Sequence, residues 1–321
     1  MKAIRIEKTG GPEVLEWTDV DLPPPSAGQA RVKHTAVGVN FIDIYHRTGL
    51  YKMPLPLILG SEAAGVVEAV GAGVSVLKPG DRVAYVGTNT YAEENNVPAD
   101  RLVKLPAGVS DEVAAAAMLK GMTAQYLLKR TYPVKKGQTI LWHAAAGGVG
   151  LIACQWAKHL GVHVIGTVGA ESKIALAKSH GAVHAISTHD KDWPKKVRAL
   201  TNGEGVPVVY DSIGKATWEG SLDCLAVRGM MVSFGNASGP VPEFSPGVLS
   251  AKGSLDLTRP SLFHDTRTAQ ELQETADDLF DVIKSGAVKI EIHQRFKLAD
   301  AAKAHEALES RATTGATILL P

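Results

Sequence analysis

The stretch TILWHAAAGGVG, residues 139–150, decides the fold of this chain. Thr139–Ala144 is a short apolar strand candidate, and the residues after it repeat apolar side chains at the spacing of an amphipathic helix. Ala145, Gly147 and Gly150 stand at the three positions of the dinucleotide fingerprint, with alanine in place of the first glycine. Such a turn lets the backbone approach a pyrophosphate, which the helix N-terminus attracts. We therefore expect a nucleotide site here; the alternative is a merely structural glycine turn.

Strand and helix signals continue to alternate from this turn to about residue 260. Strands are expected at His163–Val168, Val206–Asp211 and Met230–Gly235, and helices at Glu171–His180 and Thr217–Leu225. Strand–helix–strand alternation at this pitch predicts a parallel sheet with helices on both faces.

The regions before and after this alternating segment have different sequence patterns. The first third looks all-β, because short Val- and Ile-rich stretches alternate with Pro- and Gly-rich turns, and this spacing suits a small irregular barrel. The strand candidates are Ala30–Val39, Gly65–Val70 and Arg82–Val86. Helices are expected at Asp111–Arg130, Arg267–Ser285 and Leu298–Arg311, and a further strand at Ala287–Ile292.

The end of the strand expected at His163–Val168, the second in the alternating region, indicates which nicotinamide cofactor is bound. An NAD enzyme normally carries Asp or Glu there for the ribose 2′-hydroxyl, whereas a 2′-phosphate requires a neutral residue and a nearby cation. Here the strand ends at Val168 and Lys173 follows within one turn, which favours NADPH. In the alternative interpretation Lys173 is a solvated helix residue and Glu171 is the ribose ligand.

Composition limits the remaining possibilities. A chain of 321 residues suggests about two domains. The net charge of +1 disfavours a protein that binds polyanions through bulk charge, so no nucleic-acid partner is expected. The first residues lack the apolar core of a signal peptide and no long apolar run follows, so we expect a cytoplasmic protein without a membrane span.

Potential nucleophiles and acid–base groups give little signal. The two cysteines, Cys154 and Cys224, are too few for a disulfide framework or a four-thiolate zinc site. Cys154 falls on the amphipathic helix, where a small buried thiol is the usual outcome. His143 is interpreted as a packing or hydrogen-bonding residue, and His46 either faces a pocket or lies on the surface. No nucleophile is expected.

Several longer stretches together resemble one family across essentially the whole chain. They are residues 38–45 (GVNFIDIY), 47–51 (RTGLY), 59–66 (LGSEAAGV), 144–150 (AAAGGVG), 209–214 (VYDSIG), 232–236 (VSFGN) and 258–261 (TRPS). The chain is similar to the medium-chain dehydrogenase/reductase superfamily, and within it to the zinc-free quinone oxidoreductases of the zeta-crystallin type. The resemblance implies an NADPH-dependent enzyme that reduces small quinones.

The family's fold and assembly follow from the same resemblance. It implies an α/β architecture: a GroES-like β domain of residues 1–124 with 262–321, and a Rossmann domain with a doubly wound parallel sheet, residues 125–261, that binds NADPH. The cofactor would lie between the domains. A homodimer is expected, with the strand near Gly253–Leu257 as the edge.

The family's site residues carry over to named positions of this sequence. Catalytic residues at the nicotinamide and substrate end would be Asn40, Tyr45, Tyr51 and Thr123. The residues that would bind the cofactor are Asn40, Phe41, Tyr45, Gly147, Gly148, Val149, Gly169, Ser172, Lys173, Thr188, Ile213, Phe234, Gly235, Asn236, Pro260 and Arg311. Among these, Gly169, Ser172 and Lys173 would take the adenosine 2′-phosphate. Close relatives carry a Tyr where this chain has Thr188, so the preference for NADPH is expected to be weaker here.

The zinc ligands of other superfamily members are missing. Zinc alcohol dehydrogenases have a Cys where this chain has Asn40 and a His-Glu pair where it has Ser61-Glu62, and their third ligand region, Arg101–Thr139, contains neither Cys nor His. We therefore expect no metal. A quinone is electrophilic enough to be reduced without zinc. The alternatives are an NADPH-dependent reductase of α,β-unsaturated carbonyls and a non-enzymatic NADPH-binding structural or RNA-binding protein.

Overall fold

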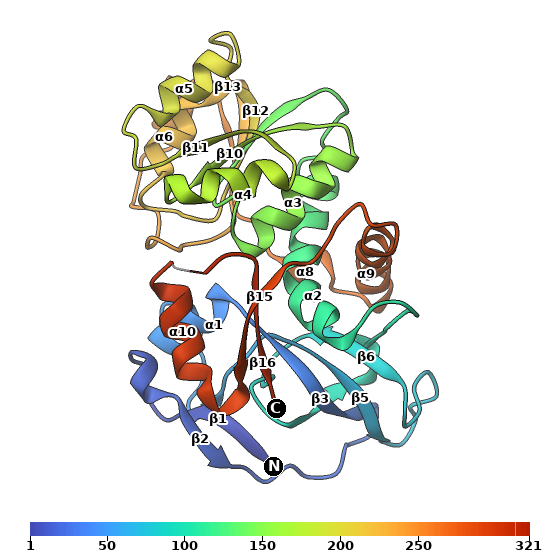
Figure 1. The fold of residues 1–321 in the computed structure, drawn as a ribbon. Helices are drawn as coiled ribbons and strands as arrows, with labels where there is room; N and C mark the ends of the chain where they lie inside the picture. Colours follow the sequence, from blue (N-terminus) through green and yellow to red (C-terminus); the bar gives the residue numbers. More distant parts are fainter. Residues whose placement is uncertain (312) are drawn as a thin grey trace. The chain divides into compact units, whose positions relative to one another are not determined.

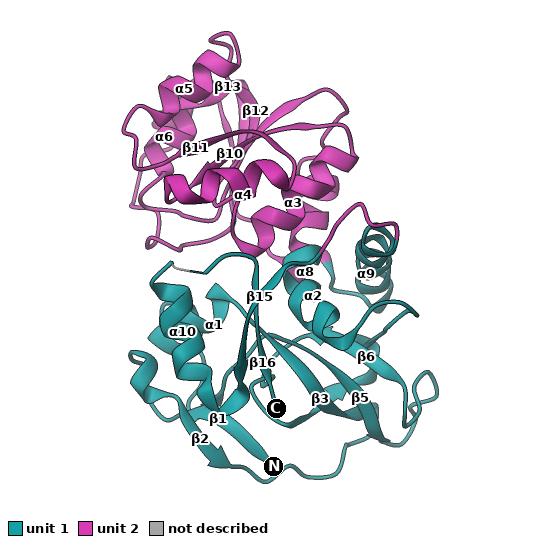
Figure 2. Ribbon diagram, viewed as in Figure 1, with its two compact units in different colours: residues 1–122, 266–284, 290–321 teal, residues 123–265, 285–289 magenta. Residues whose placement is uncertain are grey.

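The computed structural model describes residues 1–311 and 313–321, and the chain divides into two compact units (Figures 1 and 2). Unit 1 contains residues 1–122, 266–284 and 290–321, and unit 2 contains residues 123–265 and 285–289. Helix α2 (Asp111–Tyr126) begins in unit 1 and ends in unit 2. No helix within the described ranges has the length and apolar character that a membrane crossing needs.

Unit 2 is built on a six-stranded sheet in the order β11-β10-β9-β12-β13-β14. Every neighbouring pair in it is parallel. The strands are β9 (Thr139–Trp142), β10 (His163–Val168), β11 (Ala182–Ser187), β12 (Val206–Asp211), β13 (Leu225–Ser233) and β14 (Asp256–Thr258). The chain runs outward from β9 to β11 and then returns to β12 on the other side of β9. This order is that of a dinucleotide-binding sheet, whose switch point lies between β9 and β12.

Helices connect these strands, as the alternating pattern predicts. They are α3 (Gly148–His159), α4 (Ile174–Ser179), α5 (Trp193–Leu200), α6 (Trp218–Asp223) and α7 (Gly247–Ala251). A short π-helix at Leu127–Thr131 precedes the sheet, and α8 (Leu262–Asp265) follows it. Trp193 of α5 and Trp218 of α6 pack on sheet residues such as Leu141 and Val209, while α3 and α4 contact β10 (Figure 1). The expected doubly wound parallel sheet is confirmed. The helix expected at Glu171–His180 is divided into a 3-10 turn, Glu171–Lys173, and α4.

Unit 1 is mainly antiparallel. Its larger sheet has the order β15-β16-β3-β5-β6-β8 with β7 paired to β3, and a smaller sheet has the order β2-β1-β4. The strands are β1 (Lys2–Ile6), β2 (Glu16–Asp19), β3 (Gln29–Val39), β4 (Leu57–Ile58), β5 (Glu62–Val70), β6 (Arg82–Val86), β7 (Glu94–Pro98), β8 (Val103–Lys104), β15 (Ile292–Lys297) and β16 (Ala316–Leu320). Ile4, Val32, Val67 and Tyr85 from these sheets share one apolar core with Leu298.

The interpretation of the first third as all-β is wrong at one place, because α1 (Phe41–Thr48) follows β3 directly. The Asp43 carboxylate accepts a hydrogen bond from the backbone N–H of Asn40, 2.8 Å away, which helps to hold the start of the helix. Gly49, with φ of 79°, closes its C-terminus in the left-handed conformation that glycine favours. The other helices of unit 1 are α9 (Ala269–Lys284) and α10 (Ala301–Glu309), with 3-10 turns at Pro12–Val14, Ala99–Arg101 and Leu298–Asp300.

The strand expected at Ala287–Ile292 is also wrong, since β15 begins only at Ile292. The Gln155 side chain donates a hydrogen bond to the carbonyl oxygen of Lys289, 3.0 Å away, and accepts one from its N–H at 2.9 Å. The amide of Gln155 thus satisfies the backbone of Lys289 in the way a neighbouring strand would. Local β-propensity was overridden by a side chain distant in sequence.

The glycine turn yields a test of the fold. A Cβ atom on Gly150 would lie 2.2 Å from the Ala144 carbonyl oxygen and 2.7 Å from the Ala145 Cα, whereas a Cβ on Gly169 would meet nothing within 4 Å. We expect Gly150→Ala to lower the free energy of unfolding by about 1–3 kcal/mol, although alanine normally favours a helix. Gly169→Ala should change it by less than about 0.5 kcal/mol. Urea unfolding followed by circular dichroism measures both, and equal losses would contradict the close approach at Gly150.

Candidate cofactor and substrate site

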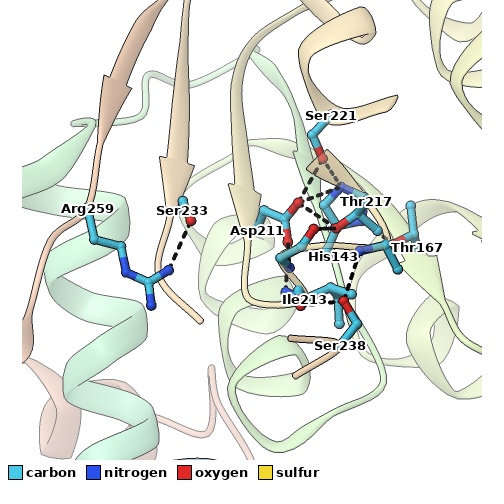
Figure 3. Close-up of polar contacts among 11 residues, drawn as sticks. His143, Thr167, Asp211, Ile213, Thr217, Ser221, Ser233, Ser238 and Arg259 are labelled. Carbon is cyan, nitrogen blue, oxygen red and sulfur yellow. Dashed lines mark hydrogen bonds and ion pairs between the residues drawn. The ribbon is translucent and has the colours of Figure 1, made fainter. Parts of the chain in front are cut away.

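Buried polar side chains gather at the switch point of the unit 2 sheet (Figure 3). Asp211 ends β12, His143 follows β9, and both are fully buried. Thr167 near the end of β10 and Ser221 on α6 contact the His143 ring. Because ligands of open α/β sheets bind outside the carboxyl ends of the strands, this cluster supports the floor of the expected nucleotide site.

Asp211 organises the loop that follows β12. One carboxylate oxygen accepts the backbone N–H groups of Ile213 at 2.7 Å and Gly214 at 3.0 Å. The other accepts the hydroxyls of Thr217 at 2.7 Å and Ser221 at 2.8 Å. Four donors compensate a carboxylate that is removed from water. The position of Ile213, a residue expected to cover the cofactor, is therefore fixed by this side chain.

The hydrogen bonds of His143 determine its tautomer. The Ser221 hydroxyl already donates to Asp211, so its oxygen accepts from Nε2–H of His143 at 2.9 Å. Nδ1 then accepts from the Thr167 hydroxyl at 2.7 Å. Burial lowers the pKa of His143, and the charge of Asp211 opposes that shift only partly. His143 is a neutral hydrogen-bonding residue, as its neighbours in the sequence indicate.

The glycine turn leaves the N-terminus of α3 without a side-chain cap. Gly147 is the N-cap residue, no side chain bonds to the first turn, and Gly148 and Val149 begin the helix. Gly150 and Gly166 leave no room for a Cβ against Ala144 and Ala145, so the turn lies tight on the sheet. An uncapped helix N-terminus at a switch point suits a phosphate group, and these residues fit a dinucleotide.

The residues expected at the 2′-phosphate end lie close together. The N–H of Thr188, after β11, donates to the carbonyl oxygen of Val168, 2.9 Å away, which places it beside Gly169. Space around Gly169 is open, and Ser172 and Lys173 follow in the 3-10 turn. Glu171 belongs to the same turn, so the structure places both proposed ribose-end ligands, the lysine and the glutamate, at this point.

The loops after β12, β13 and β14 hold the other expected cofactor residues. A Cβ on Gly235 would lie 2.5 Å from the Ser212 carbonyl oxygen, so the loop after β13 packs against the loop after β12 at a glycine. Arg259 donates to Ser233 Oγ at 2.9 Å (Figure 3). It also donates to the carbonyl oxygen of Gly235 at 3.0 Å. Arg259 thereby joins the loop after β14 to the loop after β13. The three loops carry Ile213, Phe234, Asn236 and Pro260.

Expected residues of the substrate end occur on α1 and the loop after it, in unit 1. The ring centroids of Tyr45 and Tyr51 are 5.1 Å apart in a T-shaped arrangement, and those of Phe41 and Tyr45 are 6.2 Å apart. His46 is partly buried, with its ring 6.3 Å from Tyr51, and burial lowers its pKa. Asn40 precedes the helix and is 6% exposed.

Two further expected site residues are distant in sequence from those on and around α1. Thr123 lies on α2, in unit 2 by the division of the chain, and is 8% exposed. Arg311 follows α10 in unit 1 with φ of 57°. Their roles at the site remain predictions.

A buried network supports α1 from below. Asp43 accepts hydrogen bonds from Ser61 at 2.5 Å and from the Tyr91 hydroxyl at 3.1 Å, and burial is the main cause that raises the pKa of Asp43 to about 7. Tyr91 in turn accepts from His305 Nε2–H at 3.0 Å, while Arg47 donates to Nδ1 at 3.2 Å. Burial lowers the pKa of His305 to about 3, so the ring is neutral. Helix α10 is thus joined to α1.

The residues at the positions of the family's zinc ligands do not fit a zinc ion. Glu62 is fully buried, and one of its oxygens accepts from Lys120 Nζ at 2.6 Å and from Asn40 Nδ2 at 2.8 Å. Asn40 supplies an amide where zinc alcohol dehydrogenases have a thiolate, Ser61 supplies a hydroxyl where they have an imidazole, and the Lys120 ammonium group binds the remaining carboxylate. Among residues 1–311 and 313–321, no group of three or more His, Cys, Asp or Glu side chains is arranged to hold a metal ion.

Sequence reasoning missed several residues that position the site. Asp211 and Arg259 lie in the quoted stretches 209–214 and 258–261, and Glu62 lies in 59–66, but no role was expected for the three side chains. Lys120 had no signal beyond being a cation within an otherwise apolar helix pattern. Burial of a charged side chain is informative, because Lys and Glu are almost never fully buried without a partner. Cys154 is buried, as expected for its helix position.

Comparisons with known proteins agree with this geometry. Residues 26–135 match the alcohol dehydrogenase GroES-like domain, and residues 148–281 match the zinc-binding dehydrogenase family. A quinone oxidoreductase from Pseudomonas aeruginosa is 54% identical over 100% of this chain and 99% of its own length.

Solved structures cover the whole chain as well. The crystal structure of Escherichia coli quinone oxidoreductase complexed with NADPH has a TM-score of 0.98 at 48% identity and covers 100% of both chains. A mycobacterial protein, Rv1454c, also complexed with NADPH, has a TM-score of 0.97 at 50% identity over 100% of both chains. The chain therefore belongs to the medium-chain dehydrogenase/reductase family, within its quinone oxidoreductase group.

Proposed function

We propose that this chain is an NADPH-dependent quinone oxidoreductase that reduces small quinones without zinc. The observation that carries the proposal is the full-length similarity, 54% identity, to a quinone oxidoreductase. The structure adds an uncapped glycine turn at the switch point of a dinucleotide-binding sheet, and ligand positions unsuited to zinc. The chain is accordingly an oxidoreductase, and the non-enzymatic alternative is not favoured.

The proposed roles of the residues follow from their chemistry. Backbone N–H groups of Gly147, Gly148 and Val149 bind the pyrophosphate, and Lys173 contributes a cation at the 2′-phosphate. When bound, NADPH supplies the reducing equivalents. The protein contributes proximity and orientation, and the Tyr45 hydroxyl would donate a hydrogen bond to the reduced quinone oxygen. No protein nucleophile takes part.

We further propose a homodimer in the cytoplasm. Strand β14 is at the edge of the unit 2 sheet, and Leu257 on it is 37% exposed, which supports pairing with a second copy along this edge. Cys154 and Cys224 are free thiols, in keeping with a reducing compartment.

A substrate panel tests the proposed function. NADPH oxidation should be fast with benzoquinone or naphthoquinone and slower with an alkenal, because a quinone needs no metal to polarise it. Steady-state absorbance at the reduced nicotinamide band measures each rate. An alcohol with NADP⁺ is the control; activity with that pair alone would overturn the proposal, and activity with the alkenal alone would favour an enone reductase.

The preference for NADPH is tested at Lys173. Lys173→Ala should raise the KM for NADPH by about tenfold or more while the KM for NADH changes little, because only NADPH carries the 2′-phosphate; a charge-assisted hydrogen bond contributes about 1.5–3 kcal/mol. Lys178→Ala, an exposed lysine on the following helix, is the matched control and should change neither constant. Equal effects of Lys173→Ala on both cofactors would indicate the Glu171 alternative.

A further inference from the structure

The buried cluster around Glu62 consists of Asn40, Glu62, Leu119 and Lys120. Glu62 begins β5 and is 0% exposed, and the side chain of Lys120 on α2 is 7% exposed. One Glu62 oxygen accepts from Lys120 Nζ and Asn40 Nδ2, and the other accepts from the backbone N–H of Leu119 at 2.7 Å. The carboxylate therefore meets three donors, one of them a cation.

This arrangement settles the orientation of the Asn40 amide. A carboxylate only accepts hydrogen bonds, so the amide atom 2.8 Å from Glu62 has to be the NH₂ group. The carbonyl oxygen of the Asn40 amide then lies on the side away from Glu62. The backbone N–H of Asn40 is held by Asp43, so two buried carboxylates fix this one residue.

Gly38 makes the space for the Glu62 carboxylate. A Cβ on Gly38 would lie 2.2 Å from Glu62 Oε1 and 2.3 Å from the Ala115 carbonyl oxygen, closer than real Cβ atoms approach other atoms. Any larger residue at this point of β3 would displace Glu62 or α2. The glycine two residues before Asn40 is thus explained by the cluster.

Stability alone does not account for a buried ion pair. Removing both charges from water costs several kcal/mol, and apolar residues of similar volume are often as stabilising. The pair lies next to Asn40, a residue expected at the nicotinamide and substrate end. Lys120 neutralises Glu62, so the carboxylate orients Asn40 without leaving a net negative charge beside the reacting quinone.

We infer that Glu62, with Lys120 as its counter-ion, is a positioning residue that fixes the Asn40 amide at the substrate end of the site. The inference rests on the proposed function for its kinetic consequence. Its structural consequence, a fixed amide orientation at Asn40, does not depend on the substrate.

Kinetics and nuclear magnetic resonance test the inference together. Glu62→Gln should lower kcat/KM for benzoquinone by about tenfold to a hundredfold, the cost of a misplaced group, with a smaller effect on the Kd for NADPH, because Asn40 is only one of many expected cofactor contacts. In selectively ¹⁵N-labelled protein the Asn40 side-chain NH₂ signal, identified by its loss in Asn40→Ala, should shift in Glu62→Gln and in Lys120→Met. Lys104→Met breaks an exposed pair with Asp81 in unit 1 and should leave both readouts unchanged.

A double-variant cycle separates positioning from general stability. If Glu62 acts through Asn40, then Glu62→Gln should have no further effect on kcat/KM in the Asn40→Ala background. Additive losses, or a lowered Tm with an unshifted Asn40 signal and unchanged kcat/KM, would overturn the inference. If Glu62→Gln does not fold, Lys120→Met takes its place in the cycle. Absence of quinone reduction by the unaltered chain would contradict the proposed function, while the Asn40 signal would still decide the positioning role.

Discussion

The structure of unit 2 depends on the burial of one carboxylate, that of Asp211. At the end of β12 it receives two backbone N–H groups and two hydroxyls, and these donors come from the following loop and from α6. Loss of any donor would leave part of a charge unpaired in a dry environment, which is expensive. The loop that carries Ile213 is therefore held in one conformation at the switch point, and His143 is held in one tautomer beside it.

Glu62 performs the corresponding task in unit 1. It is also fully buried, begins a strand, and takes a backbone N–H together with side-chain donors. The difference lies in its partners, since Glu62 is neutralised by Lys120 whereas Asp211 is held mainly by neutral groups. Each carboxylate stands immediately next to residues expected at the cofactor or substrate. Under the proposed function, rigid support of this kind would hold the reacting groups in place.

Much of the fold was predictable because its signals are local. The turn at residues 143–150 and the strands around it follow from glycine spacing and hydrophobic period, and His163–Val168 and Val206–Asp211 are found where the sequence predicts them. The two failures have different causes, the first non-local and the second local. The Gln155 side chain replaces a strand partner for Lys289, and α1 is held at its start by Asp43, within a region whose other signals are those of strands. The site was predicted through the family resemblance and the glycine turn, whereas its supporting charges were not.

The sequence by itself determined the doubly wound sheet, the place of the glycine turn, the neutral end at Val168, and the replacement of zinc ligands at Asn40 and Ser61, because each depends on which residues stand near one another in the chain. Only the tertiary structure decided which side chains surround those positions. Lys120 lies 58 residues from Glu62, and Ser221 lies 78 residues from His143. Which buried charge meets which donor depends on long-range packing of strands and helices, and no local pattern of residues encodes it.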